Sequence, residues 1–90
     1  LATLTGACAA ALGSKYGGLF CNNPQLADAL SEASDISGEP LWQLPLAREY
    51  HKLIFSDVAD YKNLFKDARA ITAALFLEEF VNKIPWAHLD

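Results

Sequence analysis

The alternation of apolar and polar positions along the chain predicts a succession of short strands and helices. Residues 1–6 combine leucine with β-branched threonine before a glycine, which is typical of the end of a buried strand. Residues 7–12 are a compact apolar run, and Gly13 favours a short helix that ends there. The glycine pair at 17–18 interrupts the pattern, so residues 19–21 are a second strand candidate.

A longer helix is predicted from residue 24 to residue 37. Asn23 can accept a hydrogen bond from a free amide at the helix start, and Pro24 suits the first helical position. Gly38 is expected to close the helix in a left-handed conformation. The expected apolar face comprises Leu26, Leu30, Ala33 and Ile36 or Ser37, and the polar face comprises Asp28, Ser31, Glu32 and Asp35.

The middle of the chain is less regular. Residues 39–45 hold Trp42 between two prolines and are expected to form a loop, after which a helix is expected to begin at Leu46. Residues 56–65 are polar and have no period that assigns them to a helix or a strand. In the helix expected to begin at Leu46, one side carries Leu46, Tyr50, Leu53 and Ile54, and the other carries Arg48, Glu49 and Lys52.

Residues 68–81 predict a helix that is apolar on almost every side between Ile71 and Leu77. Such a helix is expected to lie inside a larger body, between layers. Pro85 ends it, and residues 86–90 alternate as a strand does. This order of elements predicts an α/β fold built in layers, with parallel strand pairing.

Composition narrows the class of protein. Apolar residues make up 52% of the chain and charged residues 20%, which is the profile of a folded interior. A chain of 90 residues is marginal as an independent domain, so further chain is expected to cover some of this apolar surface. The formal charge of −4, without any basic run, argues against a nucleic-acid partner. No apolar stretch approaches the roughly 20 residues of a membrane-spanning helix.

The two cysteines, Cys8 and Cys21, have the spacing of neither a disulfide framework nor a zinc site. They are expected to be small, buried or half-buried apolar residues in a reducing compartment. This favours the cytoplasm or an organellar matrix.

The titratable residues form no obvious catalytic group. His88 and Asp90 would lie on one side of a strand, where they could hold a metal ion or relay a proton, although a strand-end histidine bonded to backbone is the plainer alternative. His51 is expected on the solvated side of its helix. The carboxylate pairs at 57 and 60 and at 78–79 could bind a metal ion, but capping, solvation and ion pairing need no third ligand.

Six short stretches carry a resemblance that composition does not. They are LATLTGA at 1–7, GLF at 18–20 with NN at 22–23, GEPLW at 38–42 running into LPL at 44–46, SD at 56–57 with AD at 59–60 and Asn63, ITAA at 71–74 with FL at 76–77, and WAHLD at 86–90. In this order and at this spacing they resemble the M17 leucine aminopeptidases, the cytosol aminopeptidase family, along the whole chain.

The resemblance implies that residues 1–90 are a fragment of a single catalytic domain with three layers, α/β/α. Enzymes of that family remove N-terminal residues from peptides, usually as homo-hexamers. They use two divalent cations, zinc or manganese, which activate water and polarise the scissile carbonyl. The family's metal-binding lysine and carboxylates, and its Asn-Thr-Asp-Ala-Glu-Gly-Arg motif, precede the point that matches residue 1. This segment is therefore expected to supply no metal ligand and no catalytic side chain, and to be inactive alone, whereas the parent protein is expected to be a metallo-aminopeptidase.

The functional feature that the resemblance implies for this segment is a stretch of main chain. In the family the Thr-Leu-Thr-Gly turn lines the pocket for the N-terminal side chain, and the matching positions are Thr3, Leu4 and Gly6. These are the candidate substrate-binding residues. A glycine here would let the chain approach a ligand closely, and the alternative is that Gly6 is only a turn residue.

One stretch departs from the family pattern. Where the family commonly has a glycine-rich loop, residues 64–70 are LFKDARA and contain no glycine. Such a loop is expected not to reach positive φ, and the region is expected to continue as helix instead. Two alternatives stay open: a catalytically inactive structural relative of the family, and a free-standing interaction module.

Overall fold

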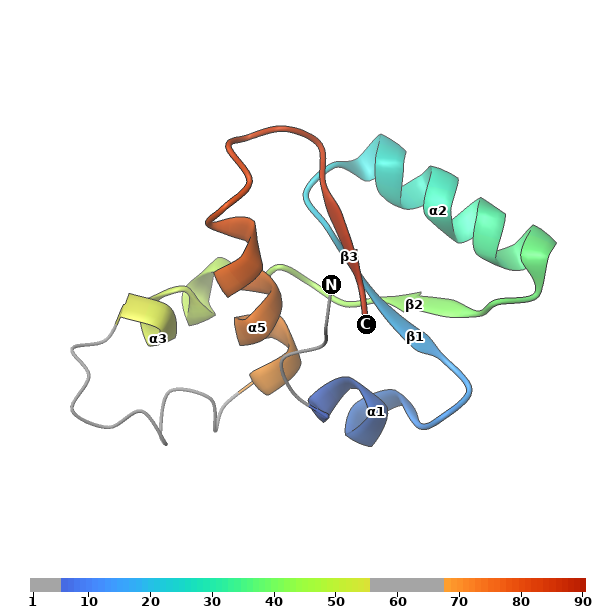
Figure 1. Ribbon diagram of the computed structural model, residues 1–90, viewed down its shortest axis with the longest axis horizontal. Coiled ribbons are helices and arrows are strands. Elements are labelled where there is room, and N and C mark those ends of the chain that lie inside the picture. The colour runs from blue at the N-terminus through green and yellow to red at the C-terminus, as the bar shows by residue number, and fades with distance from the viewer. Residues whose placement is uncertain (1–5, 56–67) are drawn as a thin grey trace.

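The computed structural model describes residues 6–55 and 68–90, and its three strands form one sheet in the order β2-β1-β3 (Figure 1). Strand β1 (Gly17–Cys21) is central, and β2 (Leu41–Gln43) pairs with it in parallel. Strand β3 (Ala87–Leu89) pairs with β1 in the antiparallel direction. The α/β class is confirmed, but the expectation of parallel pairing is wrong for β3.

The direction of β3 follows from how the chain enters it. The Asn22 side chain donates to the Ile84 carbonyl (2.9 Å) and accepts from the Trp86 amide (2.7 Å). The main-chain amide of Asn22 donates to the Trp86 carbonyl (3.2 Å). These bonds hold the start of β3 beside the end of β1. A strand that begins there must run back along β1, which makes the pair antiparallel.

Helices cover both faces of the sheet, as the expected three-layer arrangement requires (Figure 1). Helix α2 (Pro24–Ser37) packs on β1 and β2, whereas α1 (Ala7–Leu12) packs on β1 and on α5 (Arg69–Glu78). Successive side chains of a strand point to opposite faces, so Leu19 and Phe20, both fully buried, serve different layers.

The best-defined core lies between β1, α1 and α5. Phe20 forms a buried cluster there with Cys8, Ala70 and Ala74. Small residues on both helices let them approach the sheet closely, and the Phe20 ring fills the space between them. The partly buried residues packed around this cluster are Ala7, Leu12, Leu44, Leu46 and Ile71.

Both predicted ends of α2 are confirmed. The Asn23 side-chain oxygen accepts a hydrogen bond from the Leu26 amide (2.9 Å), with Pro24 in the first helical turn. Gly38 closes the helix at φ 76° in the left-handed region, where a glycine carries no Cβ penalty.

The predicted apolar face of α2 is partly wrong. Ala27 and Ser34 are its buried residues, while Ala33 is exposed and Ile36 is 80% exposed. Ser34 is buried because its hydroxyl joins the helix to the following strand: it donates to the Glu39 carbonyl (2.7 Å) and accepts from the Leu41 amide (2.9 Å).

The predicted loop at residues 39–45 contains strand β2, so that prediction is wrong. Main-chain bonds tie both ends of β2 to β1: the Gly17 amide donates to the Pro40 carbonyl (3.0 Å) and the Leu44 amide donates to the Leu19 carbonyl (2.9 Å). A three-residue edge strand needs few donors, so prolines are tolerated just outside its ends.

The two helices predicted in the second half are shorter than expected. A 3₁₀ turn at Arg48–Tyr50 and helix α3 (Lys52–Phe55) replace a helix from Leu46, and among the described residues no side chain caps the start of the 3₁₀ turn at Ala47. Helix α5 stops at Glu78, and Lys83 at φ 63° turns the chain toward β3.

Ala68 corrects the expectation that a stretch without glycine avoids positive φ. It precedes α5 at φ 46°, ψ 50°, a left-handed conformation that costs an alanine about 1–2 kcal/mol. The helix therefore does not continue backward through Ala68. Residues 1–5 of the strand end predicted at residues 1–6, and residues 56–67, lie outside the described residues.

Neither described stretch of the chain includes a helix that is long and apolar enough to cross a membrane.

The link from α2 to β2 is testable at Ser34. Replacing it with alanine leaves the partly buried Leu41 amide without its partner, which costs about 1 kcal/mol. We expect Ser34→Ala to speed amide hydrogen exchange across β2 and to lower the melting temperature of the full-length protein. Ser31→Ala, at an exposed position of the same helix, is the control and should change neither. Equal exchange in the two variants would contradict this role.

Candidate functional site

Gly6, the candidate residue that the structure describes, lies at the start of α1 and is exposed. Its φ of −92° is open to any residue, and a Cβ built on it meets nothing within 4 Å. Its carbonyl accepts a hydrogen bond from the Ala10 amide (3.2 Å), so Gly6 moves with the helix. Neither backbone conformation nor packing within the described residues requires a glycine here. Thr3 and Leu4 lie outside the described residues.

Two residues further along, Cys8 fixes α1 to the sheet. Its side chain is only 3% exposed and belongs to the Phe20 cluster. The contact below it is unusually close, because a Cβ built on Gly18 would lie 2.3 Å from the Cys8 sulfur. Helix α1 therefore rests directly on the backbone of the central strand.

Strand β3 meets α1 at the same point. Gly18 and Asp90 exchange two main-chain hydrogen bonds, of 2.7 and 2.9 Å, which places the end of β3 beside Cys8. Burial raises the pKa of the Cys8 thiol, the negative charge of Asp90 raises it further, and a hydrogen bond with the Gly18 backbone opposes both. A buried thiol with a raised pKa is a packing group and a poor nucleophile.

His88 lies on the same face of β3 as Asp90, as its spacing predicts, but it sits in an aromatic stack. The ring is 6% exposed, with the Phe20 ring at 6.0 Å and the Trp86 ring at 6.3 Å, centroid to centroid. Its cross-strand partner is Phe20, so the contact follows from the register of the sheet. This arrangement gives His88 a packing role.

An ion pair and a histidine–carboxylate contact join the turn before α3 to the end of α5. Arg48 contacts both carboxylate oxygens of Glu78, one of them at 3.0 Å, and these hydrogen bonds raise the pKa of Arg48. His51 Nε2 lies 2.5 Å from a Glu79 oxygen. The adjacent carboxylates thus take the ion-pairing role expected for them, whereas the expectation that His51 is simply solvated is wrong. Asp57 and Asp60 lie outside the described residues.

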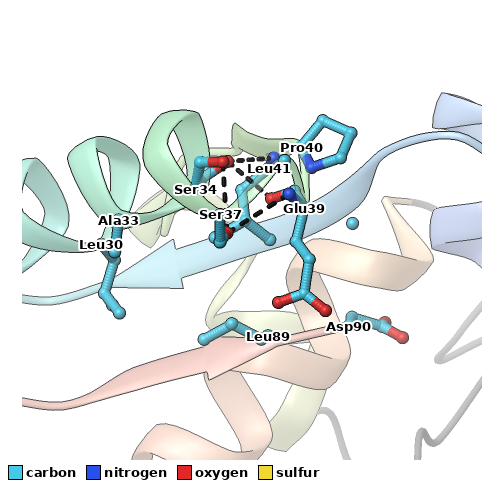
Figure 2. A pocket seen from close by; sticks show the side chains of 11 residues that line it. Leu30, Ala33, Ser34, Ser37, Glu39, Pro40, Leu41, Leu89 and Asp90 are labelled. Carbon is cyan, nitrogen blue, oxygen red and sulfur yellow. Dashed lines mark hydrogen bonds between the residues drawn. The ribbon is translucent and has the colours of Figure 1, made fainter.

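A hollow of about 710 Å³ lies on the α2 face, where β1 and β2 begin and β3 ends (Figure 2). Leu30 and Ala33 line one end, and Glu39 extends its carboxylate toward Leu89 and Asp90 (Figure 2). The Ser34 hydroxyl at its edge is already engaged with backbone. The hollow therefore offers apolar surface and has few free polar groups that could orient a ligand.

A second hollow, of about 390 Å³, lies at the opposite end of the sheet, where β1 and β2 end. Its lining is more polar, but two of the polar side chains already form hydrogen bonds. The Asn22 side chain bonds to the chain leading into β3, and the Asn23 side chain bonds to the start of α2. Arg48 at its rim is paired with Glu78. Its lining residues are Cys21, Asn22, Asn23, Pro24, Ala27, Asp28, Gln43, Leu46 and Arg48.

Within residues 6–55 and 68–90, no three side chains of His, Cys, Asp or Glu gather closely enough to hold a metal ion. Among these described residues, His88 and Asp90 have no third candidate ligand beside them.

Sequence reasoning missed the meeting of Cys8, Gly18 and Asp90. A glycine in a strand is a weak signal of close backbone approach, and nothing in the sequence says which helix approaches it. The two contacts between the turn before α3 and the end of α5 could not be predicted either, because Arg48 and Glu78 are 30 positions apart and His51 and Glu79 are 28 apart.

Comparison with protein families gives a match along the whole chain. The description "Cytosol aminopeptidase family, catalytic domain" fits residues 1–90. A "Probable cytosol aminopeptidase" of Thermosynechococcus vestitus is 56% identical over 91 aligned positions, which cover 100% of this chain and 18% of that protein. A "Cytosol aminopeptidase" of Buchnera aphidicola subsp. Acyrthosiphon pisum is 52% identical over the same shares. The chain thus spans about a fifth of the length of these relatives.

Solved structures agree with this match. The "Bottromycin maturation enzyme BotP" superposes with a TM-score of 0.86 at 43% identity, covering 99% of this chain and 20% of that one. A second structure of the same enzyme is "in complex with Mn" and matches equally well.

The buried thiol gives a test of the contact between α1 and β1. In the native full-length protein we expect Cys8 to react with iodoacetamide at least about tenfold more slowly than half-buried Cys21, because burial blocks access and a raised pKa leaves less thiolate at any pH. In denaturant the two rates should converge. Peptide mass spectrometry measures both, and equal rates in the folded protein would contradict the packing described for Cys8.

Proposed function

The chain belongs to the cytosol aminopeptidase family, and from that premise we propose that it is a segment of the catalytic domain of a peptide-hydrolysing aminopeptidase. In this proposal the parent protein removes N-terminal residues, leucine and similar ones, from peptides. The segment contributes scaffold and pocket backbone. The match of the family description to every residue of the chain is the observation that carries the proposal.

We assign the pocket backbone to Thr3, Leu4 and Gly6. Support comes from Gly6, which is exposed at the start of α1 with open space where a Cβ would be. A glycine that neither its φ nor its neighbours require is consistent with a surface that something else approaches closely. Bound peptide would be that approaching group, and main-chain polar atoms would be its partners.

The parent enzyme is proposed to use two divalent cations, zinc or manganese. The similar BotP enzyme is described in complex with manganese, which supports a metal-dependent chemistry for the parent. Since residues 6–55 and 68–90 do not bring together a set of ligands, the metal-binding side chains are assigned to other parts of the parent chain. Such a metal would polarise the scissile carbonyl and activate water. The role of this segment is to hold the pocket beside it.

The setting follows from the relatives. They are named cytosol aminopeptidases, and from that name we infer a cytoplasmic location, with peptides as partners. The proposed homo-hexameric assembly of the parent protein rests on the resemblance to the family alone.

The role of Gly6 is testable by adding one methyl group. Gly6→Ala should leave the melting temperature of the full-length protein within about 1 °C, because the new Cβ meets nothing. It should lower kcat/KM for leucine p-nitroanilide by about tenfold or more, if backbone at this position touches substrate. Ala11→Ser, which adds one atom at an exposed position near the end of α1, is the control and should leave kcat/KM unchanged. Unaltered kinetics for Gly6→Ala would remove Gly6 from the pocket.

The division between scaffold and catalytic machinery is testable with the segment itself. We expect the 90-residue chain to show no hydrolysis of leucine p-nitroanilide above background with added zinc or manganese, whereas the full-length protein turns the substrate over. Calorimetric titration with manganese should detect no tight site on the segment. Robust metal-dependent turnover by the 90 residues would overturn the assignment of scaffold, and an inactive full-length protein would favour a structural relative of the enzymes.

A further inference from the structure

We propose that Gly18 and Cys8 are positioning residues that set the height of α1 over the sheet, and through it the place of Gly6 at the substrate pocket. This inference rests on the proposed function, because it gives Gly6 a task that depends on its position. Neither residue would touch substrate, and both would act through the backbone of α1.

The contact between Gly18 and Cys8 leaves no space for an added methyl group. A Cβ at Gly18 would lie 2.3 Å from the Cys8 sulfur, about 1 Å short of ordinary van der Waals contact, which begins at 3.4 Å. The same Cβ would sit 3.5 Å from the Phe20 ring and 3.6 Å from Leu44, both at ordinary distance. The conflict is therefore with α1 alone.

Cys8 cannot easily give way. Its sulfur is a single atom beyond Cβ, and its side chain is 3% exposed within a cluster that includes Ala70 and Ala74 of α5. A longer side chain could bend its far end aside, but here the neighbours close off the alternatives. The helix itself must therefore move if Gly18 gains a methyl group.

Movement of α1 reaches Gly6 directly. The Gly6 carbonyl is bonded to the Ala10 amide (3.2 Å), so the first turn holds Gly6 and Cys8 in one rigid unit. On the other side, Gly18 is fixed by two main-chain bonds to Asp90. The strand therefore holds its place, and the displacement falls on the helix. A misplacement of about 1 Å at a binding group can cost roughly 100-fold in rate.

The neighbouring glycine provides a matched control. A Cβ at Gly17 points to the α2 face, where its closest contact is the Cδ2 end of the Leu41 side chain at 3.0 Å, with the Asp90 carbonyl oxygen at 3.4 Å. Gly17→Ala thus adds the same methyl group to the same strand without touching α1. A partly buried leucine can turn its end aside.

The experiment uses the full-length protein with leucine, alanine and phenylalanine p-nitroanilides. Gly18→Ala should raise KM for the leucine substrate by about tenfold and change the order of preference among the three substrates, while Gly17→Ala stays within about twofold of wild type. A merely structural loss would lower the active fraction, and so kcat, and leave KM and preference unchanged. The rate of Cys8 alkylation reports displacement of α1 independently of enzyme activity. This rate should rise about tenfold in Gly18→Ala and should not change in Gly17→Ala.

A second substitution tests the cause. Cys8→Ala removes the sulfur that the new methyl group meets, so Cys8→Ala with Gly18→Ala should return KM and substrate preference to within about twofold of Cys8→Ala alone. A double variant no better than Gly18→Ala, or a Gly17→Ala variant with the same KM shift, overturns the proposal. If wild type turns over peptides and Gly18→Ala binds substrate normally, positioning fails while the aminopeptidase assignment stands. An inactive wild type would count against the assignment instead, and the alkylation rates would still decide whether α1 moves.

Discussion

The close approach of helix α1 to the backbone of Gly18 is the constraint on which the rest of this end of the molecule depends. Gly18, in the central strand, has no Cβ, so the Cys8 sulfur can lie 2.3 Å from the place where a Cβ would be. The same residue holds Asp90 through two main-chain bonds, so helix, central strand and last strand meet at one point. Phe20, two residues along the same face of β1, then fills the space beneath α1 and α5.

Two side chains form the hydrogen bonds that position the flanking strands of the sheet. Beyond the end of β1, the Asn22 amide group supplies the donor and the acceptor that guide the chain into β3. After α2, the Ser34 hydroxyl plays the same part for the start of β2. Both flanking strands have three residues, and each would otherwise have few bonds to hold its register. The buried Ser34 hydroxyl is stabilising here because it both donates and accepts a hydrogen bond.

Local chemistry explains which elements could be predicted from the sequence. The predicted ends of α2 are correct because Asn23, Pro24 and Gly38 act on residues next to them in the sequence. Helix α1 and strand β3 are likewise predicted from short patterns. Strand β2 was missed because three residues between prolines carry too little pattern to outweigh the turn signals around them. The direction of β3 depends on Asn22, far away in the sequence. The exposure of Ile36 shows the same limit, since periodicity describes a helix face but not what packs against it.

The candidate site illustrates the same division between local and distant causes. Gly6 was found through a resemblance in a contiguous motif, and the structure adds that α1 starts there with space above it. What holds that backbone in place involves residues 8, 18 and 90, which no motif joins. As a proposed site residue, Gly6 would offer only main-chain atoms, so its chemistry could not be altered by exchanging a functional group. It can be altered only by moving the backbone, and the small residues packed beneath α1 decide how far that backbone can move. Under the proposed function, substrate selection by this segment would depend on packing density one layer away from the substrate.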